Sequence, residues 1–161
     1  MKKTILTFLF LFGLFYSKAQ ERFTQEVSAE YSVEYCDDCN IEPGVVPFTI
    51  TVKHRKEENA MEKAKYAAVK AVLLKGIPGS PVSQPLISYT QYEQKKEWID
   101  KFLDSKECHN FIGKTQVNPE KTVKIKSGLF KNGFEAGINV EVMYDNLKRF
   151  LTQNKVIKFG L

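Results

Sequence analysis

The sequence predicts one α+β domain, a mostly antiparallel sheet with helices packed on one face, in the order ββαα(β)ββα. Alternating apolar and polar residues mark strands near both ends of the chain, and stretches with helical spacing lie between and after them. Of the 161 residues, 43% are hydrophobic, which is enough for one core and too little for two. We therefore expect residues 20–161 to form a single domain behind a signal peptide at 1–19.

The first two strands are predicted from strict alternation. Apolar residues from Val27 to Tyr35 alternate with polar ones, and a second alternating stretch runs from Phe48 to Arg55. The residues between them, Cys36 to Gly44, are rich in turn formers. These two stretches are therefore expected to pair as a hairpin.

A helix is predicted from Asn59, as its N-cap, to Lys75, with Gly76 as its stop and Pro78 preventing its continuation. One face of this helix is lined by alanines, which allow close packing on a sheet. These are Ala60, Ala64, Ala67, Ala68 and Ala71. Tyr66, Val69 and Leu73 form an apolar stripe on the opposite face, which must be covered by the chain's own next helix or by a partner.

The next helix is expected to begin at a capping box of Thr90 and Glu93 and to end near Ser105. Its apolar stripe contains Tyr92, Ile99, Phe102 and Leu103. Trp98, the one tryptophan, lies on the rim of this stripe, as a core-edge residue or as part of a binding surface. The candidate binding residues are therefore Tyr66, Val69, Leu73 and Trp98.

The last third of the chain predicts strands followed by a helix. A strand is possible at Phe111 to Val117, another is expected around Val123 and Ile125, and Asn132-Gly133 predicts a tight turn into a strand from Phe134 to Tyr144. Asp145 is the expected cap of a final helix with Leu147, Phe150 and Leu151 inward, followed by an alternating tail of Ile157, Phe159 and Leu161. A row of Glu26, Glu30 and Glu34 could lie beside Lys124 and Lys126 on the exposed sheet face.

The N-terminus has the pattern of a signal peptide. Lys2 and Lys3 precede an apolar run from Ile5 to Phe15, and Ser17 and Ala19 are the small residues before an expected cleavage at Gln20. No second long apolar stretch follows, so we expect a periplasmic or extracellular chain with no transmembrane segment after cleavage. Losing three lysines lowers the formal net charge from +5 to +2, which argues against nucleic acid as a partner.

The cysteines are the conspicuous candidates for chemistry. Export favours a disulfide involving Cys36 or Cys39, but Cys108 makes the count odd and the pairing stays open. Asp37 and Asp38 between the first two thiols disfavour redox catalysis. Adding Cys108 and His109 would give four zinc-type ligands without the spacing of a known finger, so no metal, cofactor or catalytic residue is predicted.

Two stretches resemble a family of secreted, largely uncharacterised bacterial envelope proteins. The first is Ala60 to Ser80 with Gln84-Pro85-Leu86 after it, and the second is Ile138 to Ile157, a strand running into Tyr144-Asp145-Asn146-Leu147 and a short helix. More distantly they are similar to the N-terminal domain of a flagellar outer-ring assembly protein and to related small outer-membrane lipoproteins. The resemblance implies a compact α+β envelope domain without known enzymatic activity, although this chain lacks the cysteine that carries a lipid.

Together these observations favour a non-enzymatic exported envelope domain that binds an envelope protein or itself, as a protein-binding or assembly module. The alternatives are a small exported enzyme such as a hydrolase, and a thiol or metal site at Cys36, Cys39, Cys108 and His109.

Overall fold

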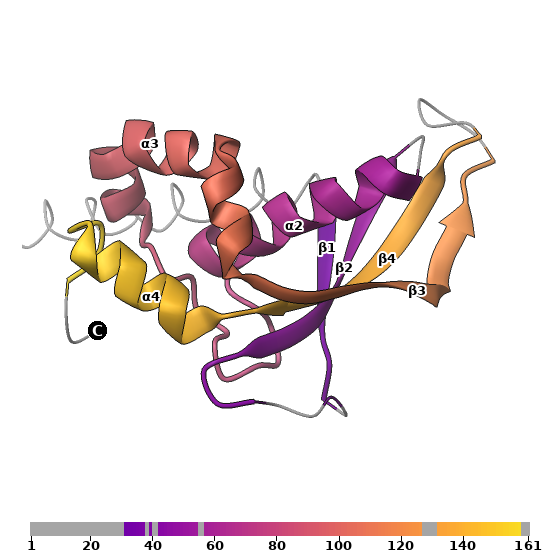
Figure 1. Ribbon diagram of the computed structural model, residues 1–161, viewed down its shortest axis with the longest axis horizontal. Coiled ribbons are helices and arrows are strands. Elements are labelled where there is room, and N and C mark those ends of the chain that lie inside the picture. The colour runs from indigo at the N-terminus through magenta and orange to yellow at the C-terminus, as the bar shows by residue number, and fades with distance from the viewer. Residues whose placement is uncertain (1–30, 38, 40–41, 55–56, 127–131, 159–161) are drawn as a thin grey trace, which may run out of the picture.

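The computed structural model describes residues 31–37, 39, 42–54, 57–126 and 132–158 (Figure 1). The expected signal peptide and the first part of the expected first strand, residues 27–30, lie outside the described residues. Phe159 and Leu161 of the expected tail lie outside them as well, whereas Val156 and Ile157 are buried.

A four-stranded antiparallel sheet organises the domain. Its strands are β1 (Tyr31–Tyr35), β2 (Val46–His54), β3 (Ile112–Lys124) and β4 (Phe134–Val142), in the spatial order β1-β2-β4-β3. Ile50 of β2 lies between Val33 of β1 and Ile138 of β4, so the apolar positions of neighbouring strands are in register. One face of the sheet is consequently apolar and buried, and the other carries polar side chains.

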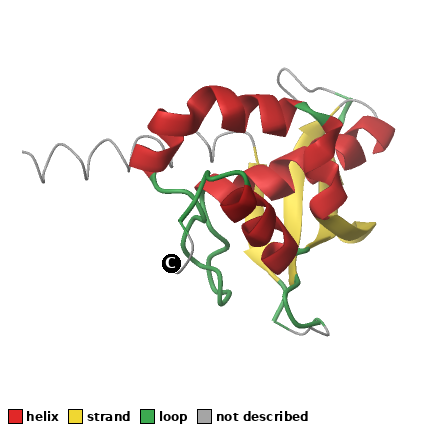
Figure 2. Ribbon diagram, turned by 60° about the vertical axis from the view of Figure 1, so that its left-hand side comes forward, coloured by secondary structure: helices red, strands yellow, loops and turns green. Residues whose placement is uncertain are grey.

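Helix α2 (Glu57–Leu74) lies on the apolar face, as the sequence predicts, whereas α3 (Tyr89–Asp104) packs on α2 and on the 3-10 helix η1 (Lys106–Phe111), and α4 (Tyr144–Gln153) packs on η1 (Figures 1 and 2). Helix α2 contacts β2 and β4, and its five alanines are at most 1% exposed, which confirms close packing on the sheet. Helix α3 continues through η1 into β3, and α4 follows β4. The order is ββααββα, which confirms the α+β class.

The ends of α2 show one correct and one wrong prediction. Gly76 stops the helix in the left-handed conformation, with φ of +78°, and its N–H donates to the carbonyl of Ala71 at 2.8 Å. Asn59 is not the N-cap, because the helix already begins at Glu57 and places Asn59 inside its first turn.

The caps of α3 and α4 also differ from the prediction. Ser88 and Gln91, not Thr90 and Glu93, form the capping box of α3. The Ser88 hydroxyl accepts from the Gln91 N–H at 3.4 Å, and the Gln91 amide oxygen accepts from the Ser88 N–H at 2.9 Å. Asp145 does not cap α4 with its side chain; its N–H instead donates to the carbonyl of Gly44 at 3.1 Å.

Strand β3 merges two strands that the sequence suggests separately. It pairs with β4 through register shifts between Ile112 and Thr115 and between Asn118 and Val123, and these irregularities interrupt the alternation. Asn132 adopts φ of +68°, and its N–H donates to Ile125 at 3.0 Å. The Asn132-Gly133 pair therefore closes a longer connection, of which residues 127–131 lie outside the described part, and is not a two-residue turn.

Candidate functional site

The predicted apolar stripe on α2 is only partly accessible. Val69 and Leu73 are 0% exposed, so neither side chain is accessible to a partner in this structure. Tyr66 is half-buried, and the ammonium of Lys70 lies 5.6 Å from the centre of its ring. The alternative, that the chain itself covers this side of α2, is the one observed.

The covering segment is held by the unpaired carbonyls at the end of α2. The last carbonyls of a helix have no partner within the helix and must find one elsewhere. The N–H of Leu86 donates to Val72 at 3.1 Å, and the N–H of Ile87 donates to Leu73 at 2.9 Å. The segment after Gly76 therefore returns along α2 and buries Ile87 before α3 begins.

Trp98 belongs to a group of four aromatic side chains from three elements, which we call the aromatic cluster. Its members are Trp98 and Phe102 of α3, Phe111 of η1 and Phe150 of α4. Trp98 stacks on Phe102 with ring centroids 5.4 Å apart, and Phe150 lies 5.0 Å from Phe111 and 6.1 Å from Trp98. Phe102 is 4% exposed, whereas the other three are half-buried, so the cluster reaches the surface.

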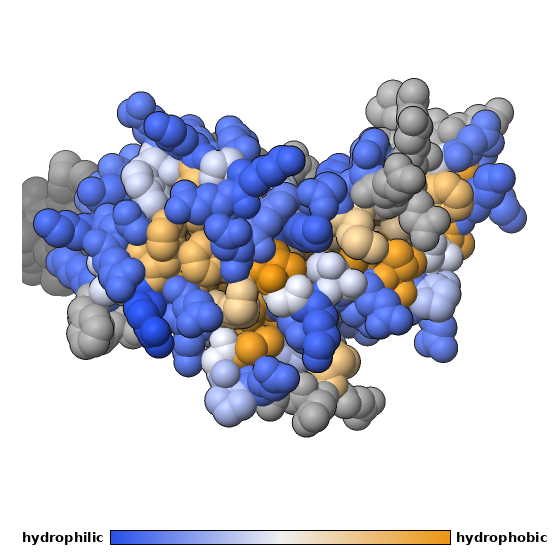
Figure 3. All heavy atoms as spheres, viewed as in Figure 1, coloured by the Kyte–Doolittle hydropathy of each residue, from blue (hydrophilic) through white to orange (hydrophobic). Residues whose placement is uncertain are grey.

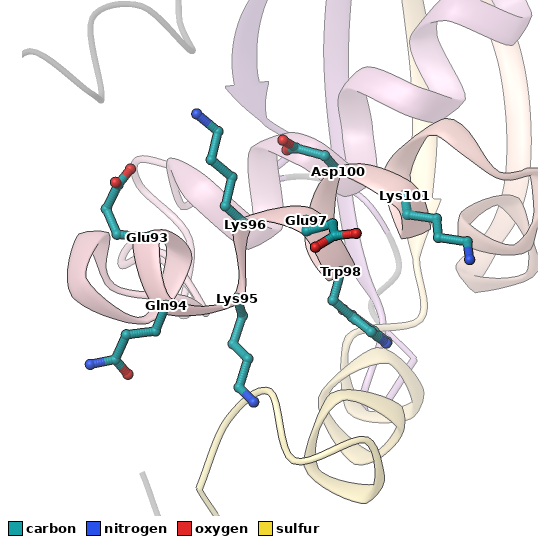
Figure 4. A pocket seen from close by; sticks show the side chains of 8 residues that line it. All are labelled: Glu93, Gln94, Lys95, Lys96, Glu97, Trp98, Asp100 and Lys101. Atoms are coloured by element: carbon teal, nitrogen blue, oxygen red, sulfur yellow. The ribbon is translucent and has the colours of Figure 1, made fainter.

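The surface around the aromatic cluster carries charges of both signs on its α3 side, and the exposed Glu97 lies next to Trp98 along the helix. Lys95 and Lys101 lie three residues before and after Trp98, which puts both next to it on the helix surface. Lys95 and Trp98 both point from α3 toward α4, whereas Glu93, Lys96 and Asp100 point away from it (Figure 4). Apolar side chains gather between the two helices and are surrounded by hydrophilic ones (Figure 3).

A shallow hollow of about 850 Å³ runs along α3 beside this surface. All of its lining residues, from Glu93 to Lys101, come from this single helix, and most of them are exposed and charged. Small-molecule sites are usually concave, largely apolar and closed by several elements. The hollow therefore resembles an open contact surface more than a ligand pocket.

Tyr92 and Asp100 are joined along α3. The Tyr92 hydroxyl donates to the Asp100 carboxylate at 2.9 Å. Burial, and then the hydrogen bond to Asp100, raise the pKa of Tyr92 to about 12, so this hydroxyl stays protonated in the physiological range.

The cysteines form one disulfide and leave one buried thiol. Cys36 and Cys39 are bonded to each other, with their Cα atoms 5.4 Å apart, which confirms the expected bridge and supplies the pairing that the sequence left open. The Cys108 thiol donates to the carbonyls of Ser105 at 3.2 Å and Leu103 at 3.4 Å, and its burial raises its pKa to about 11. Because two of its four sulfur and nitrogen donors are bonded to each other, the zinc-type site is not formed.

His109 contacts α2. Its Nδ1 lies 3.6 Å from Oε2 of Glu62, whose other oxygen accepts from Lys65 at 2.7 Å. The hydrogen bond from Lys65 lowers the pKa of Glu62. Among the residues that the structure describes, no group of three or more histidine, cysteine and acidic side chains is placed to hold a metal ion.

The polar sheet face has a different charge pairing from the predicted one. Strands β1 and β3 lie at opposite edges, so Lys124 and Lys126 are not neighbours of Glu34, whereas Glu26 and Glu30 lie outside the described residues. Instead, the irregular part of β3 folds over Gly137, where an added Cβ would lie 2.5 Å from that of Lys121. From this position the Lys121 ammonium forms an ion pair with the Glu34 carboxylate at 2.6 Å, and the Lys121 side chain crosses the two inner strands, β2 and β4.

A hydrogen-bonded row lies beneath this ion pair. The Thr49 hydroxyl donates to the side-chain oxygen of Asn139 at 2.9 Å, and the Asn118 amide donates to the same oxygen at 3.2 Å. Thr49 is only 7% exposed although it lies on the face without helices. The irregular part of β3 thus covers this face locally.

No helix within the described ranges has the length and apolar character needed to cross a membrane. No protein-family model, curated protein or solved structure matches this chain.

Sequence reasoning found only part of the candidate surface. It selected Trp98 as a rim residue and Phe150 as an inward one, but it did not bring them together. These residues are 52 positions apart in the sequence. They meet because α4 follows β4 and lies beside α3 in the folded chain. No local signal reveals such a contact.

Proposed function

We propose that this chain is a non-enzymatic exported envelope domain that binds another protein through the aromatic cluster, as a protein-binding or assembly module. The observation that carries the proposal is the meeting of Trp98, Phe111 and Phe150 at the surface between α3 and α4. Aromatic residues are enriched at the centres of protein interfaces, and tryptophan is among the residues whose loss weakens binding most.

The disulfide and the N-terminal sequence pattern support an exported location for this protein. Disulfides persist mainly in oxidising compartments such as the periplasm and the extracellular space. The Cys36–Cys39 bond is compatible with the export expected from residues 1–19. We place the working protein in the periplasm or outside the cell.

The charges around the aromatic cluster indicate the chemistry of its partner. Lys95 and Lys101 are exposed on either side of Trp98, while Asn146 and Gln153, near Phe150 on α4, are exposed and neutral. Complementary charge steers association and rejects wrong partners more than it adds affinity. A matching partner presents an apolar side chain to Trp98 and Phe150, with acidic groups directed toward Lys95 and Lys101.

The test begins with a photo-crosslinking amino acid in place of Lys95, beside Trp98, which should capture the protein bound there. The control has the same amino acid in place of Lys124 on β3. The captured protein is then purified, and its binding is followed by the emission of Trp98, the sole tryptophan. We expect the emission to shift on binding. We also expect the two single variants Phe150→Ala and Trp98→Ala each to weaken binding about ten-fold or more, as measured by calorimetry.

Lys124→Ala is the matched control and should bind as the unchanged protein does. Circular dichroism of each variant separates lost binding from lost folding. Binding that is as tight in folded Trp98→Ala as in the unchanged protein would exclude this surface as the interface.

A further inference from the structure

Helix α4 and the residues directly after it carry a concentration of positive charge at one end of the molecule (Figure 1). From Asn146 to Lys158 the sequence has four basic residues and no acidic one. We call these four residues the α4 cations: Lys148, Arg149, Lys155 and Lys158. Lys148 is half-buried and the other three are exposed. Their charge is therefore presented to whatever lies outside the molecule.

The α4 cations lack the acidic partners that lysines elsewhere in the fold have. Lys53, Lys65, Lys114 and Lys121 each lie within 4.0 Å of a glutamate carboxylate. Within the part of the chain that the structure describes, none of the α4 cations forms such an ion pair. Positive charge on this surface is consequently not neutralised by neighbouring side chains.

Asp145, the acidic residue nearest to them in the sequence, is held at the loop before β2. It lies four residues before Arg149, a spacing that allows an ion pair along a helix. Its carboxylate instead packs on Gly44, where an added Cβ would lie 2.7 Å from Oδ2, and its N–H donates to the carbonyl of Gly44 at 3.1 Å. Contact with the loop thus keeps Asp145 away from Arg149.

The dipole of α4 accounts for only part of this charge. Cations are favoured near the C-terminal end of a helix, but the effect falls off within the last turn. Because α4 ends at Gln153, this explanation applies to Lys155 and Lys158. Lys148 and Arg149 lie in the middle of the helix, so their positive charge is not explained by its end.

Arg149 lies on the outside of α4. The buried residues of this helix are Leu147 and Leu151, and Arg149 is two positions from each, about 200° around the helix. Its side chain therefore points away from the core, and Lys148 lies beside it at the edge of the same face. The surface is the convex outside of a helix and not a groove.

We propose that the α4 cations bind the surface of an anionic membrane. Clustered lysines and arginines are attracted to anionic lipid headgroups, and this attraction requires no cavity. Other anionic partners fit this surface less well. Protein interfaces are depleted in lysine, and single-stranded nucleic acids are bound in grooves where their bases stack on aromatic rings.

This contact leaves the aromatic cluster accessible. Phe150 is about 100° around the helix from Arg149 and lies on the side of α4 that meets Trp98 of α3. A molecule resting on a bilayer through Arg149 and Lys148 consequently holds the aromatic cluster beside the membrane and not beneath it. The inference goes beyond the proposed function and does not depend on it.

Co-sedimentation with lipid vesicles tests the inference. The full chain is expressed and purified in the form that the cell produces, and is mixed with vesicles of phosphatidylglycerol and phosphatidylcholine or of phosphatidylcholine alone. We expect binding to the anionic vesicles that weakens as salt is added, because salt screens the attraction. The double variant Lys148→Gln, Arg149→Gln should bind them about twenty-fold more weakly, which is about five-fold for each cation removed.

The matched control is the double variant Lys114→Gln, Lys124→Gln, which loses the same charge from exposed positions of β3. It should bind the anionic vesicles within about two-fold of the unchanged protein. Trp98→Ala should also bind them as the unchanged protein does, which separates this inference from the proposed protein-binding surface. Circular dichroism shows that each variant is folded.

Equal losses in the two double variants would overturn the inference, because the contact would then not depend on α4. Equally tight binding to vesicles of phosphatidylcholine alone would do the same, since lipid charge would play no part. A protein that binds soluble polyphosphate but not the anionic vesicles would have a polyanion, and not a membrane, as its ligand.

Discussion

Two glycines after α2 show how a single residue is selected by its surroundings. Gly76 and Gly79 both have positive φ, +78° and +82°. A Cβ at Gly76 would lie 2.3 Å from the carbonyl oxygen of Ser83, whereas the nearest atom to a Cβ at Gly79 is Tyr35 Cβ at 3.9 Å. Both positions need the left-handed conformation, but only Gly76 is also enclosed by backbone.

We therefore predict different losses of stability for two equivalent substitutions. Gly79→Ala should lower the free energy of unfolding by about 1 kcal/mol, the usual cost of the left-handed conformation for alanine. Gly76→Ala adds a backbone clash and should cost about 2–4 kcal/mol in total. Urea unfolding followed by circular dichroism measures both, and equal losses would contradict the structural difference.

At this scale, the sequence revealed what depends on local chain geometry. Gly76 was predictable because a glycine followed by Pro78 is a common helix end. The crossing of Lys121 over Gly137 was not, because it requires the irregular pairing of β3 with β4. Val69 and Leu73 were recognised as apolar, but what covers them depends on a return of the chain that spacing does not encode.

At the scale of the element, the start of α3 shows how two equally good local signals compete. Ser88 with Gln91 and Thr90 with Glu93 both fit a capping box, and the structure uses the first. Tertiary contacts favour the first signal. Ile87 is buried and its N–H donates to the carbonyl of Leu73, so the chain is held in place up to this residue and the helix begins directly after it.

Substitution at the two candidate caps should separate these signals. Ser88→Ala removes the hydroxyl that accepts from the Gln91 N–H and leaves the bond from the Ser88 N–H in place, and it should lower the free energy of unfolding by about 1 kcal/mol. Thr90→Ala changes an exposed residue inside the helix and should alter it by no more than about 0.5 kcal/mol. Thermal unfolding of the two variants provides the comparison, and a larger loss for Thr90→Ala would restore the cap expected from sequence alone.

For the whole molecule, the class was predictable because alternation and helical spacing are properties of long segments. The strand order and the single 13-residue β3 were less accessible, since Pro119 and the register shifts break its alternation. The aromatic cluster was least accessible of all. It joins three elements whose proximity follows from the completed sheet.

The disulfide makes only a local contribution to the stability of this molecule. Cys36 and Cys39 are three residues apart, so the bond closes a very short loop and removes little freedom from the unfolded chain. Reduction should therefore cost about 2 kcal/mol or less and leave the domain folded. Near-ultraviolet circular dichroism with and without a reductant tests this, and complete unfolding on reduction would show that the bridge holds more than its own turn.

The contact between Lys121 and Glu34 also links the two margins of the sheet through electrostatics. Because one partner comes from β3 and the other from β1, dissolved salt that screens this contact weakens an attraction between the two edge strands. Both side chains are partly exposed, so the contribution to stability is small and falls as ionic strength rises. Backbone hydrogen bonds join only neighbouring strands, and this one pair of side chains adds a direct link between the two outermost ones.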